Sequence, residues 1–388
     1  MGDIYPPQRS TVGKVDTLLS KKLEDVEWGE FKIGDLFEKI KTKKLPFKAD
    51  ELSKQIKGKY ILPCLTSSFQ NQGLNYFAPK AGATVLKNVI SIPSNSDVYR
   101  AYFQSNEFTV LSDAYAIKWT YNQVELSPNQ YLFAVQCINK VTDLPIYSYK
   151  NKLGGWNVVK NKYIQLPMKN KNINFDFMEK IISEIEAEKI SKLKAYLEEN
   201  GLDDYDLTAK EREVLEDFES GKFHWKNFNL ENLFGKSTRG RRLKSADRIS
   251  GDLPFVTAGE ANEGISAFIG NDVAVFSENT TTIDMFGSAK YRNYKYGGDD
   301  HIAVVHTNDL PKFASIFLTS AIHKSSYTGE FHYGRNFYAK DAYELDISLP
   351  TKNNQPDYQL METLISAVHK LVIKDVVLYV ENRLTGDR

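Results

Sequence analysis

Two stretches of the chain carry apolar residues at helical spacing over nearly three heptads. The first begins near residue 175 and stops at Asn200-Gly201, a pair that commonly ends helices, and the second occupies the C-terminal residues. A repeat of about 3.5 residues is typical of helices that pack along each other, so we expect two long helices paired as an antiparallel coiled coil. The expected pairing positions are Met178, Ile182, Ile185, Leu193 and Tyr196 in the first helix and Met361, Ile365, Val368, Val372, Val376 and Tyr379 in the second.

The segments before these stripes alternate short β-leaning runs with Gly and Asn turns, for example at 89–92, 114–117 and 302–305. A short apolar helix near 129–140 and another near 313–324 interrupt the runs. Each segment is therefore expected to fold as a mixed α/β (α+β) domain.

The two halves of the sequence match each other in order and spacing, which indicates a tandem duplication. The matched positions include Trp28 and Trp225, Phe31 and Phe228, Leu36-Phe37 and Leu233-Phe234, Leu62-Pro63 and Leu253-Pro254, Phe133 and Phe317, Ile138 and Ile322, Lys140 and Lys324, and Leu166-Pro167 and Leu349-Pro350. The duplication predicts two pseudo-symmetric domains, separated by the two long helices. The expected division is an N-terminal extension (1–26), a first domain (27–170), a central helix with an acidic linker (171–222), a second domain (223–350) and a C-terminal helix (351–388).

The acidic linker is rich in Asp and Glu between residues 198 and 219. Thr208 followed by Glu211 offers a capping box for a short helix near 207–218. Two interpretations stay open for this segment: a solvated linker, or a surface that binds a partner protein.

The composition is that of an ordinary folded protein, with 388 residues and 41% hydrophobic positions. Its two cysteines, Cys64 and Cys137, lie far apart in sequence, so neither a disulfide framework nor a thiolate zinc site is expected. No apolar run has the length of a signal peptide or a membrane span, and we expect a soluble, cytoplasmic protein.

The sequence offers no familiar catalytic constellation. All six histidines lie in the second copy, which argues against a histidine catalyst or metal ligand set shared by both copies. Phosphate-binding, dinucleotide-binding and nucleophile-elbow motifs are missing, and Tyr5-Pro6-Pro7-Gln8 only superficially resembles an adenine-methyltransferase signature. We expect no catalytic site, no metal site and no cofactor on this chain.

Basic clusters follow the same Leu-Phe pair in both copies. One such run is usually a solvated face, but its recurrence favours binding to nucleic acid, where Lys and Arg neutralise phosphates. The clusters comprise Lys39, Lys41, Lys43, Lys44 and Lys48 in the first copy and Lys236, Arg239, Arg241, Arg242 and Lys244 in the second.

Cations alternate with tyrosines in 290–296, and Tyr99-Arg100-Ala101-Tyr102 occupies the aligned region of the first copy. The competing interpretation is an ordinary β-strand whose tyrosines pack inward. Polar loops at 66–73 and 257–264 share an Asn and a Gly that suit either DNA contacts or a turn with positive φ. The remaining DNA-contact candidates are Thr66, Ser67, Ser68, Gln70, Arg100, Tyr102 and Lys152 in the first copy and Thr257, Glu260, Lys290, Arg292, Lys295 and Arg335 in the second.

This arrangement resembles the DNA-specificity (S) subunits of type I restriction-modification systems and the recognition subunits of BcgI-like type IIB systems. The resemblance rests on the Trp-x-x-Phe-x-x-x-x-Leu-Phe opening of each copy, the Leu-Pro-x-x-Thr motif, the Leu-Pro exit and the long helix that follows. It implies one target-recognition domain per half of a split DNA sequence. It further implies helices that dock two methyltransferase subunits, with S-adenosylmethionine on those partners and restriction subunits as further partners. The acidic segment 198–219 departs from the family pattern.

Two other classes of protein fit the sequence: a self-contained DNA-modifying or DNA-cleaving enzyme, and a tandem scaffold that binds proteins only. The 50 basic and 50 acidic residues sum to zero net charge, which alone argues against a DNA partner. The balance combines basic clusters in the domains with acidic residues between 179 and 219, so it does not weigh against DNA binding.

Overall fold

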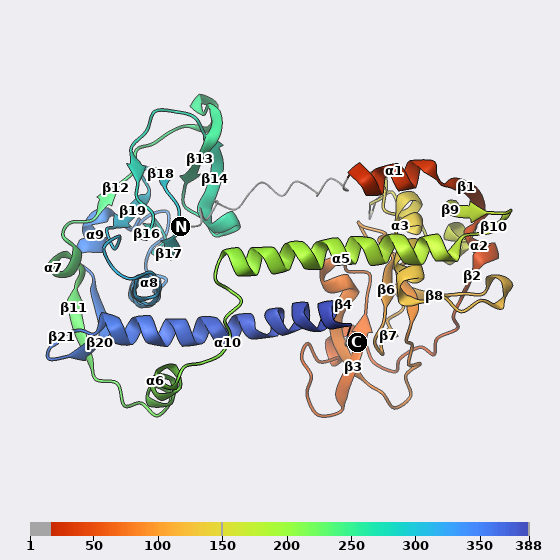
Figure 1. Ribbon diagram of the computed structural model, residues 1–388, viewed down its shortest axis with the longest axis horizontal. Helices are drawn as coiled ribbons and strands as arrows, with labels where there is room; N and C mark the ends of the chain where they lie inside the picture. Colours follow the sequence, from red (N-terminus) through yellow and green to blue (C-terminus); the bar gives the residue numbers. More distant parts are fainter. Residues whose placement is uncertain (1–16, 149, 387–388) are drawn as a thin grey trace. The chain divides into compact units, whose positions relative to one another are not determined.

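The computed structural model describes residues 17–148 and 150–386. Tyr5-Pro6-Pro7-Gln8 and most of the expected N-terminal extension lie outside these residues. The described chain divides into an N-terminal unit that ends at Lys189 and a C-terminal unit that starts at Ile190 (Figure 1). The division falls inside one long helix, α5 (Phe175–Glu199).

The N-terminal unit is built from three small sheets packed with helices. The sheets have the strand orders β1-β9-β10, β2-β8-β5-β6 and β4-β3-β7. The elements before α5 are α1 (Thr17–Asp25), β1 (Glu27–Lys32), α2 (Ile33–Leu36), β2 (Phe37–Lys39), β3 (Tyr60–Leu65), β4 (Leu74–Pro79), β5 (Val89–Pro93), β6 (Tyr102–Gln104), β7 (Thr109–Val110), β8 (Ala114–Trp119), α3 (Pro128–Thr142), α4 (Trp156–Val159), β9 (Tyr163–Lys169) and β10 (Asn172–Ile173).

The C-terminal unit repeats this plan. Its sheets have the orders β11-β20-β21, β12-β19-β16-β17 and β14-β13-β18-β15. Its elements are α6 (Ala209–Glu219), β11 (Trp225–Asn229), α7 (Leu230–Phe234), β12 (Thr238–Arg239), β13 (Ser250–Val256), β14 (Ile265–Ile269), β15 (Val275–Phe276), β16 (Thr280–Asp284), β17 (Ala289–Arg292), β18 (Tyr296–Gly298), β19 (Ile302–Val305), α8 (Lys312–Ser326), α9 (Ala339–Tyr343), β20 (Asp346–Lys352), β21 (Gln355–Pro356) and α10 (Tyr358–Thr385).

The sheet pairings confirm the mixed α/β duplication. β1 pairs antiparallel with β9 just as β11 pairs with β20, and each copy holds one short parallel pair, β3 with β7 and β13 with β18. The two expected short helices are α3 and α8. In α3 the Ser127 cap and the proline at the first helical position fix the start of the helix, which then buries Phe133, Ala134 and Ile138 in the core.

The first turns of each long helix cover the core of their own domain, which corrects part of the predicted pairing stripe. Met178 is fully buried in the N-terminal core, with Ile182 and Ile185 packed against it, and Met361 is fully buried in the C-terminal core. An amphipathic stripe shows that a helix face is covered, but the period alone does not say by what.

A small apolar cluster joins the last turns of α5 to α10 within the C-terminal unit. Its buried members are Ile190, Leu197, Val377 and Val380, with Leu193, Leu202, Tyr205 and Ile373 partly buried against them. At about 100° per residue, Ile190 is rotated by about a third of a turn from Met178, so this face differs from the one that covers the core. Only Leu193 of the predicted pairing positions lies in this cluster; Ile365 is half-buried, and the exposed positions are Tyr196, Val368, Val372, Val376 and Tyr379.

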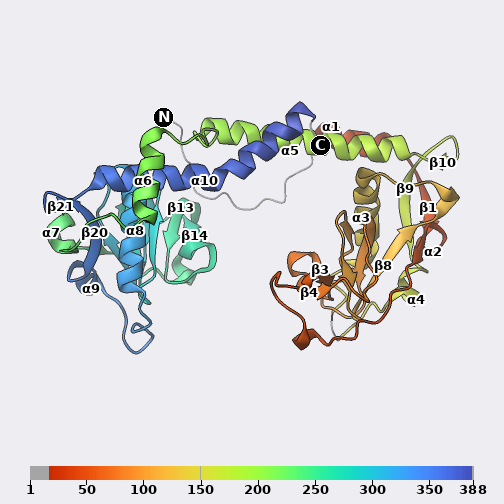
Figure 2. The ribbon, with the colours of Figure 1, turned by 90° about the horizontal axis from the view of Figure 1, so that it is seen from below.

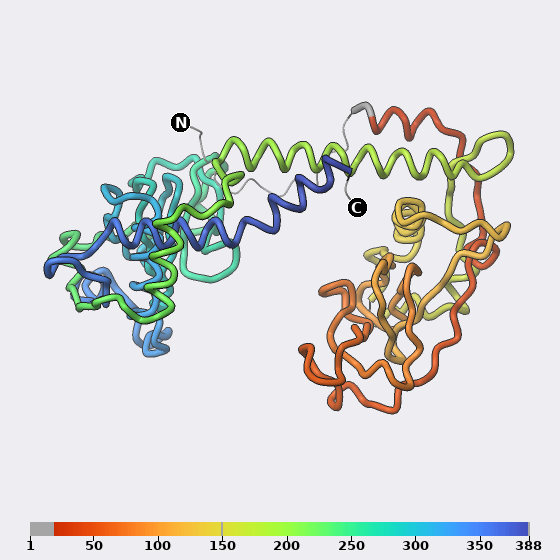
Figure 3. The backbone as a smooth tube through the Cα atoms, turned by 60° about the horizontal axis from the view of Figure 1, so that its bottom comes forward, coloured from red at the N-terminus to blue at the C-terminus, as the bar shows by residue number. Residues whose placement is uncertain are grey.

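The acidic segment after α5 packs on α10, and its helix α6 crosses α10 (Figures 2 and 3). Tyr205 donates to Glu381 at 3.4 Å, and the Lys370 ammonium lies 2.7 Å from Asp204 and 3.3 Å from Glu211. Glu211 also accepts from Ser366 at 2.7 Å and is 5% exposed. The segment is therefore not only a solvated linker, because two of its acidic residues attach it to α10.

Helix α6 has a counterpart in the first copy. Both α1 and α6 precede the opening tryptophan, both contain Leu-Glu-Asp, and both pack on the long helix of their own copy, α1 through the pair between Lys22 and Glu184. The acidic segment thus contains a repeated element, with extra residues between α6 and Trp225. None of the described helices is long and apolar enough to cross a bilayer.

The carboxyl of Glu211 gives a testable pH dependence. Burial alone would raise its pKa, but hydrogen bonds from Thr208, Ser366 and Lys370 lower the pKa from 4.5 to about 2. Because the folded pKa is depressed, the ionised carboxylate stabilises the protein fully above about pH 5, and this contribution is lost as the pH falls from about 4.5 towards 2. We expect Glu211→Gln to lower the free energy of unfolding by about 1–3 kcal/mol at pH 7.

Urea unfolding of the full chain at pH 7 and below pH 4 measures this effect. The difference between wild type and Glu211→Gln should shrink at low pH, whereas the exposed control Glu213→Gln should match wild type at both. A constant difference across pH would contradict the role given to the carboxylate.

Candidate nucleic-acid interface

The polar loops at 66–73 and 257–264 have the same backbone frame. In each, the first Thr amide donates to the last Gly carbonyl at 2.8 Å. Asn71 and Gln72 have φ of 46° and 54°, and Asn262 and Glu263 have φ of 47° and 53°. A Cβ at Gly264 would lie 2.6 Å from the Thr257 carbonyl oxygen, which excludes any side chain there. The Asn and Gly shared by the loops therefore serve the left-handed turn.

A carboxylate fixes each loop from the side. Asp113 accepts from the backbone amide of Ser67 at 3.1 Å and from its hydroxyl at 2.9 Å. In the second copy Asp284 accepts from the amide of Gly259 at 3.2 Å. Both loops are thus held in a defined conformation without a ligand.

The loop tips differ between the copies. Thr66 is 9% exposed, and its hydroxyl accepts from Asn75 at 2.8 Å, so it supports the loop rather than facing solvent. Ser67 and Ser68 are half-buried within the loop, and Phe69 and Gln70 are exposed at its tip. The second loop exposes Glu260 and keeps Thr257 half-buried. Sequence reasoning missed Phe69, an apolar residue inside a polar run that is 54% exposed.

Arg292 is not a DNA-contact residue, which corrects the prediction. It is 1% exposed, and its guanidinium donates to Thr282, to the hydroxyl of Tyr294 and, at 2.8 Å, to the carbonyl of Glu263. The last bond supports the left-handed turn of the loop from beneath. Tyr294 and Tyr296 are buried as well, so the interpretation of inward-packed tyrosines is correct for this segment.

Two other cations of this segment remain near the surface. Lys290 is half-buried and pairs with Glu260 at 3.1 Å, while Lys295 is exposed. Hydrogen bonds from Ser288 and Lys290 lower the pKa of Glu260, so the loop tip carries a carboxylate at neutral pH.

The side chains of the basic clusters are exposed, whereas hydrogen bonds hold the backbone of the clusters in place. The amide of Lys43 donates to Thr84 at 2.8 Å, and the amide of Arg241 donates to the Gly298 carbonyl at 3.0 Å. A Cβ at Gly240 would meet that carbonyl oxygen at 1.9 Å, so this approach requires glycine. The exposed members of the clusters include Lys41, Lys43, Lys44, Arg239, Arg241, Arg242 and Lys244.

Arg100 and Tyr102 lie beside the first polar loop. Arg100 pairs with Asp143 at 2.7 Å, and the Tyr102 hydroxyl donates to the Phe69 carbonyl at 3.3 Å. Both residues line a pocket of about 440 Å³ together with Gln72 and Asn139. Lys152 and Arg335 are exposed in the loops that follow α3 and α8, where Arg335 lies 3.8 Å from Glu330.

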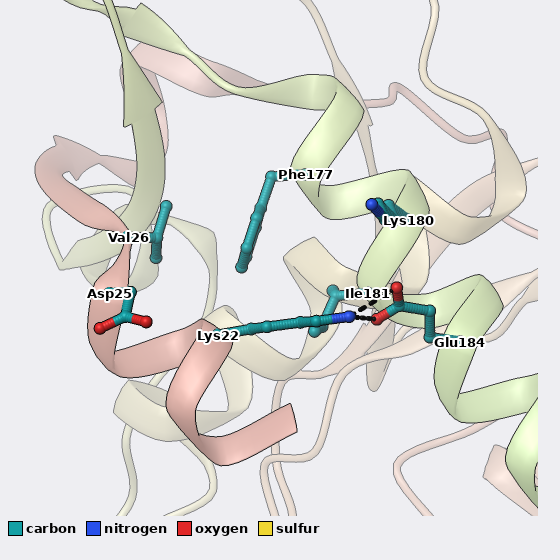
Figure 4. Close-up of a pocket in the computed structure, with 7 residues that line it drawn as sticks. All are labelled: Lys22, Asp25, Val26, Phe177, Lys180, Ile181 and Glu184. Atoms are coloured by element: carbon teal, nitrogen blue, oxygen red, sulfur yellow. Dashed lines mark hydrogen bonds and ion pairs between the residues drawn. The ribbon is translucent and has the colours of Figure 1, made fainter. Parts of the chain in front are cut away.

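The surface holds two other features that could form a ligand site or a metal site. A pocket of about 350 Å³ between α1 and α5 has an apolar floor of Val26, Phe177 and Ile181 with the Lys22–Glu184 pair at its rim (Figure 4). Its lining holds no histidine, cysteine or hydroxyl group. Among the described residues, one run, 299–301, brings three possible metal ligands within 4.8 Å of one another; they are consecutive and partly exposed, and we assign no metal there.

Comparisons with known proteins agree with this organisation. Residues 25–195 and 223–377 each match the family described as type I restriction modification DNA specificity domain. The chain is 26% identical over 256 residues to the specificity subunit of the type II restriction enzyme BcgI from Heyndrickxia coagulans. The matched region covers 65% of this chain and 70% of that protein. The crystal structure of a type I restriction-modification S subunit from M. genitalium superposes with a TM-score of 0.58 at 15% identity, over 93% of both chains, and shows the shared fold.

The support given to the second loop by Arg292 can be tested by substitution. We expect Arg292→Met to lower the free energy of unfolding by about 1–3 kcal/mol, because the Glu263 carbonyl, Thr282 and Tyr294 lose the donor that the buried guanidinium supplies. Amide hydrogen exchange at residues 262–264 should also speed up. Arg239→Met, which removes an exposed guanidinium from the same unit, is the control; equal stability of the two variants would show that Arg292 does not hold the loop.

Proposed function

The chain belongs to the type I restriction modification DNA specificity family, and from this premise we propose that it reads a bipartite duplex DNA target, one half-site per domain. The observation that carries the proposal is the pair of polar loops. Their backbones agree to within a few degrees at the left-handed turn, yet their exposed tips carry Phe69 and Gln70 in one copy and Glu260 in the other.

A shared loop backbone with different tips suits two domains that recognise different DNA sequences. A fixed frame presents the tip to DNA in the same way in both domains, and the tip chemistry selects the base. Gln pairs with adenine and Glu accepts from the amino group of cytosine, whereas an aromatic ring contacts the thymine methyl. The two half-sites are therefore expected to differ in sequence.

The exposed basic clusters would bind the phosphates on either side of the loops. Lys and Arg contacts to phosphate give affinity and orientation without sequence preference. Their position is fixed by backbone contacts such as that of Gly240, while the side chains stay in solvent.

The long helices would set the distance between the half-sites. α5 has 25 residues and is about 37 Å long at 1.5 Å per residue, close to one turn of B-DNA. In this proposal α5 and α10 pair antiparallel through the cluster around Ile190 and Val377, and each helix carries its own domain at its first turns.

The exposed apolar stripe on α10 would dock methyltransferase subunits. Val368, Val372, Val376 and Tyr379 share the face that covers the core at Met361, and they continue it beyond the domain. Two methyltransferase subunits would bind there and on the equivalent part of α5, supply S-adenosylmethionine and flip the target adenine. Catalysis would lie on these partners and this chain would supply recognition.

Charge removal tests the basic cluster. The triple change of Arg239, Arg241 and Arg242 to Ala should weaken DNA binding by the assembled complex and reduce the slope of log affinity against log salt by up to about 2.7, since each phosphate contact contributes about 0.9. The matched control replaces three exposed cations of α6 and its flank, Lys210, Arg212 and Lys222, and should leave the slope unchanged. An unaltered slope in the Arg variant would refute the assignment.

Helix length can be tested with an insertion. One heptad placed between Ile185 and Ile190 and another between Val368 and Ile373 would keep each face in register and add about 10 Å per helix, or about three base pairs. Mapping methylated sites by sequencing should show a longer unread spacer between unchanged half-sites. The same seven residues inserted after Lys222 should leave the spacer as in wild type, and an unchanged spacer in the helix variant would contradict the proposal.

A further inference from the structure

The chain between α8 and α9 forms a loop that extends past the end of α8 (Figure 2), and residues 332–335 form a tight turn within it. His332 and Arg335 close the turn through two backbone hydrogen bonds of 3.0 and 2.8 Å, and the amide of Gly334 donates to the ring of His332 at 3.1 Å. Tyr333 stands at the apex and is 85% exposed, more than any other large apolar or aromatic side chain among the described residues.

The turn is firmly supported although its apex is exposed. Ser326 donates to the Gly287 carbonyl, and the Phe337 amide donates to the Met285 carbonyl at 2.9 Å, so both ends of the loop are attached to the turn between β16 and β17. The ring of Phe331 packs on that of Phe337 at 4.8 Å, and the Arg335 guanidinium lies over Phe331 at 5.4 Å. Because the loop is held at both ends and the ring stays exposed, a ligand could pack against the ring without rearranging the loop.

The same β16–β17 turn holds the polar loop at 257–264. Asp284 accepts from Gly259 of that loop, and Lys290 pairs with Glu260 at its tip. Two residues beyond Asp284, the Phe286 ring packs edge-on against Tyr333 at 5.3 Å. Tyr333 and the polar loop at 257–264 are therefore both attached to the turn between β16 and β17.

The first copy repeats one backbone hydrogen bond of this turn. The amide of Ser148 donates to the Asn151 carbonyl at 3.0 Å, as that of His332 does to Arg335, and a buried apolar residue follows five positions after the start of each turn, Leu153 and Phe337. These pairs keep the spacing of 184 residues that relates Phe133 to Phe317. At that spacing the sequence places Tyr149, which lies outside the described residues, opposite Tyr333.

We infer that Tyr333 is a base-stacking residue, which wedges its ring against a base at a locally unstacked step of the half-site read by the C-terminal domain. The inference rests on the proposed function and adds to it a contact through the ring face, which tolerates sequence variation, next to loop contacts that read base edges. The exposed ring needs no hydrogen-bond partner for this role, and Arg335 would neutralise a neighbouring phosphate.

The test uses the complex of the full chain with its methyltransferase subunits and a duplex that contains the methylation site mapped for wild type. Tyr333→Ala should weaken binding about tenfold, whereas Tyr333→Phe, which keeps the ring, should bind as wild type. Tyr327→Ala is the matched control, because Tyr327 is 51% exposed on the same loop but packs on His323 instead of standing at the apex.

A second readout identifies the contact. 2-Aminopurine placed in turn at each position of the half-site should change fluorescence at one position on binding of wild type or Tyr333→Phe, and this change should be absent with Tyr333→Ala. Equal affinity of Tyr333→Ala and wild type would overturn the inference while leaving the proposed function intact. Equal weakening by Ala and Phe would also overturn it, because the hydroxyl and not the ring would then be the contact. A wild-type complex with no sequence preference would overturn the proposed function itself.

Discussion

The structure depends on one constraint: each long helix must pack against two different partners, its own domain and the other long helix, on different faces. Its first turns close the core of its own domain, through Met178 in α5 and Met361 in α10. Its later turns meet the other helix on a face rotated by about a third of a turn, through Ile190 and Leu197 against Val377 and Val380. Each long helix therefore presents one face to its own domain and another face to the other helix.

The acidic segment adds to the same arrangement. Lys370 lies between Asp204 and Glu211 and thereby attaches α6 to α10, as the Lys22–Glu184 pair attaches α1 to α5. Each copy thus consists of a short helix, a mixed α/β domain and a long helix, and the short helix packs on the long one. The backbone of the polar loops is the same in both copies, so their tips can differ without disturbing the turn that Asn262 and Gly264, or Asn71 and Gly73, impose.

Much of the fold could be predicted from the sequence. The duplication, the mixed α/β domains and the helices near 129–140 and 313–324 follow from periodicity and internal matching, which are local properties. The partner of each helix face did not follow, because a heptad stripe at Met178 has the same period whether a sheet or another helix covers it. Nor could residue type show that Arg292 is buried beneath a loop while Arg239 is exposed, or that Thr66 supports its loop; burial depends on contacts far apart in sequence. Tyr333 was missed because exposure at a turn apex has no sequence signal of its own, although its recurrence opposite Tyr149 could have indicated it.

The proposed function requires two domains with the same loop backbone to read two different half-sites at a fixed distance. The most direct measurement is genome-wide mapping of the adenines methylated when this chain is expressed with its methyltransferase partner. We expect a single motif made of two short, unlike sequences separated by a constant number of unread base pairs. Methylation at a contiguous motif, or at two half-sites whose separation varies, would contradict it.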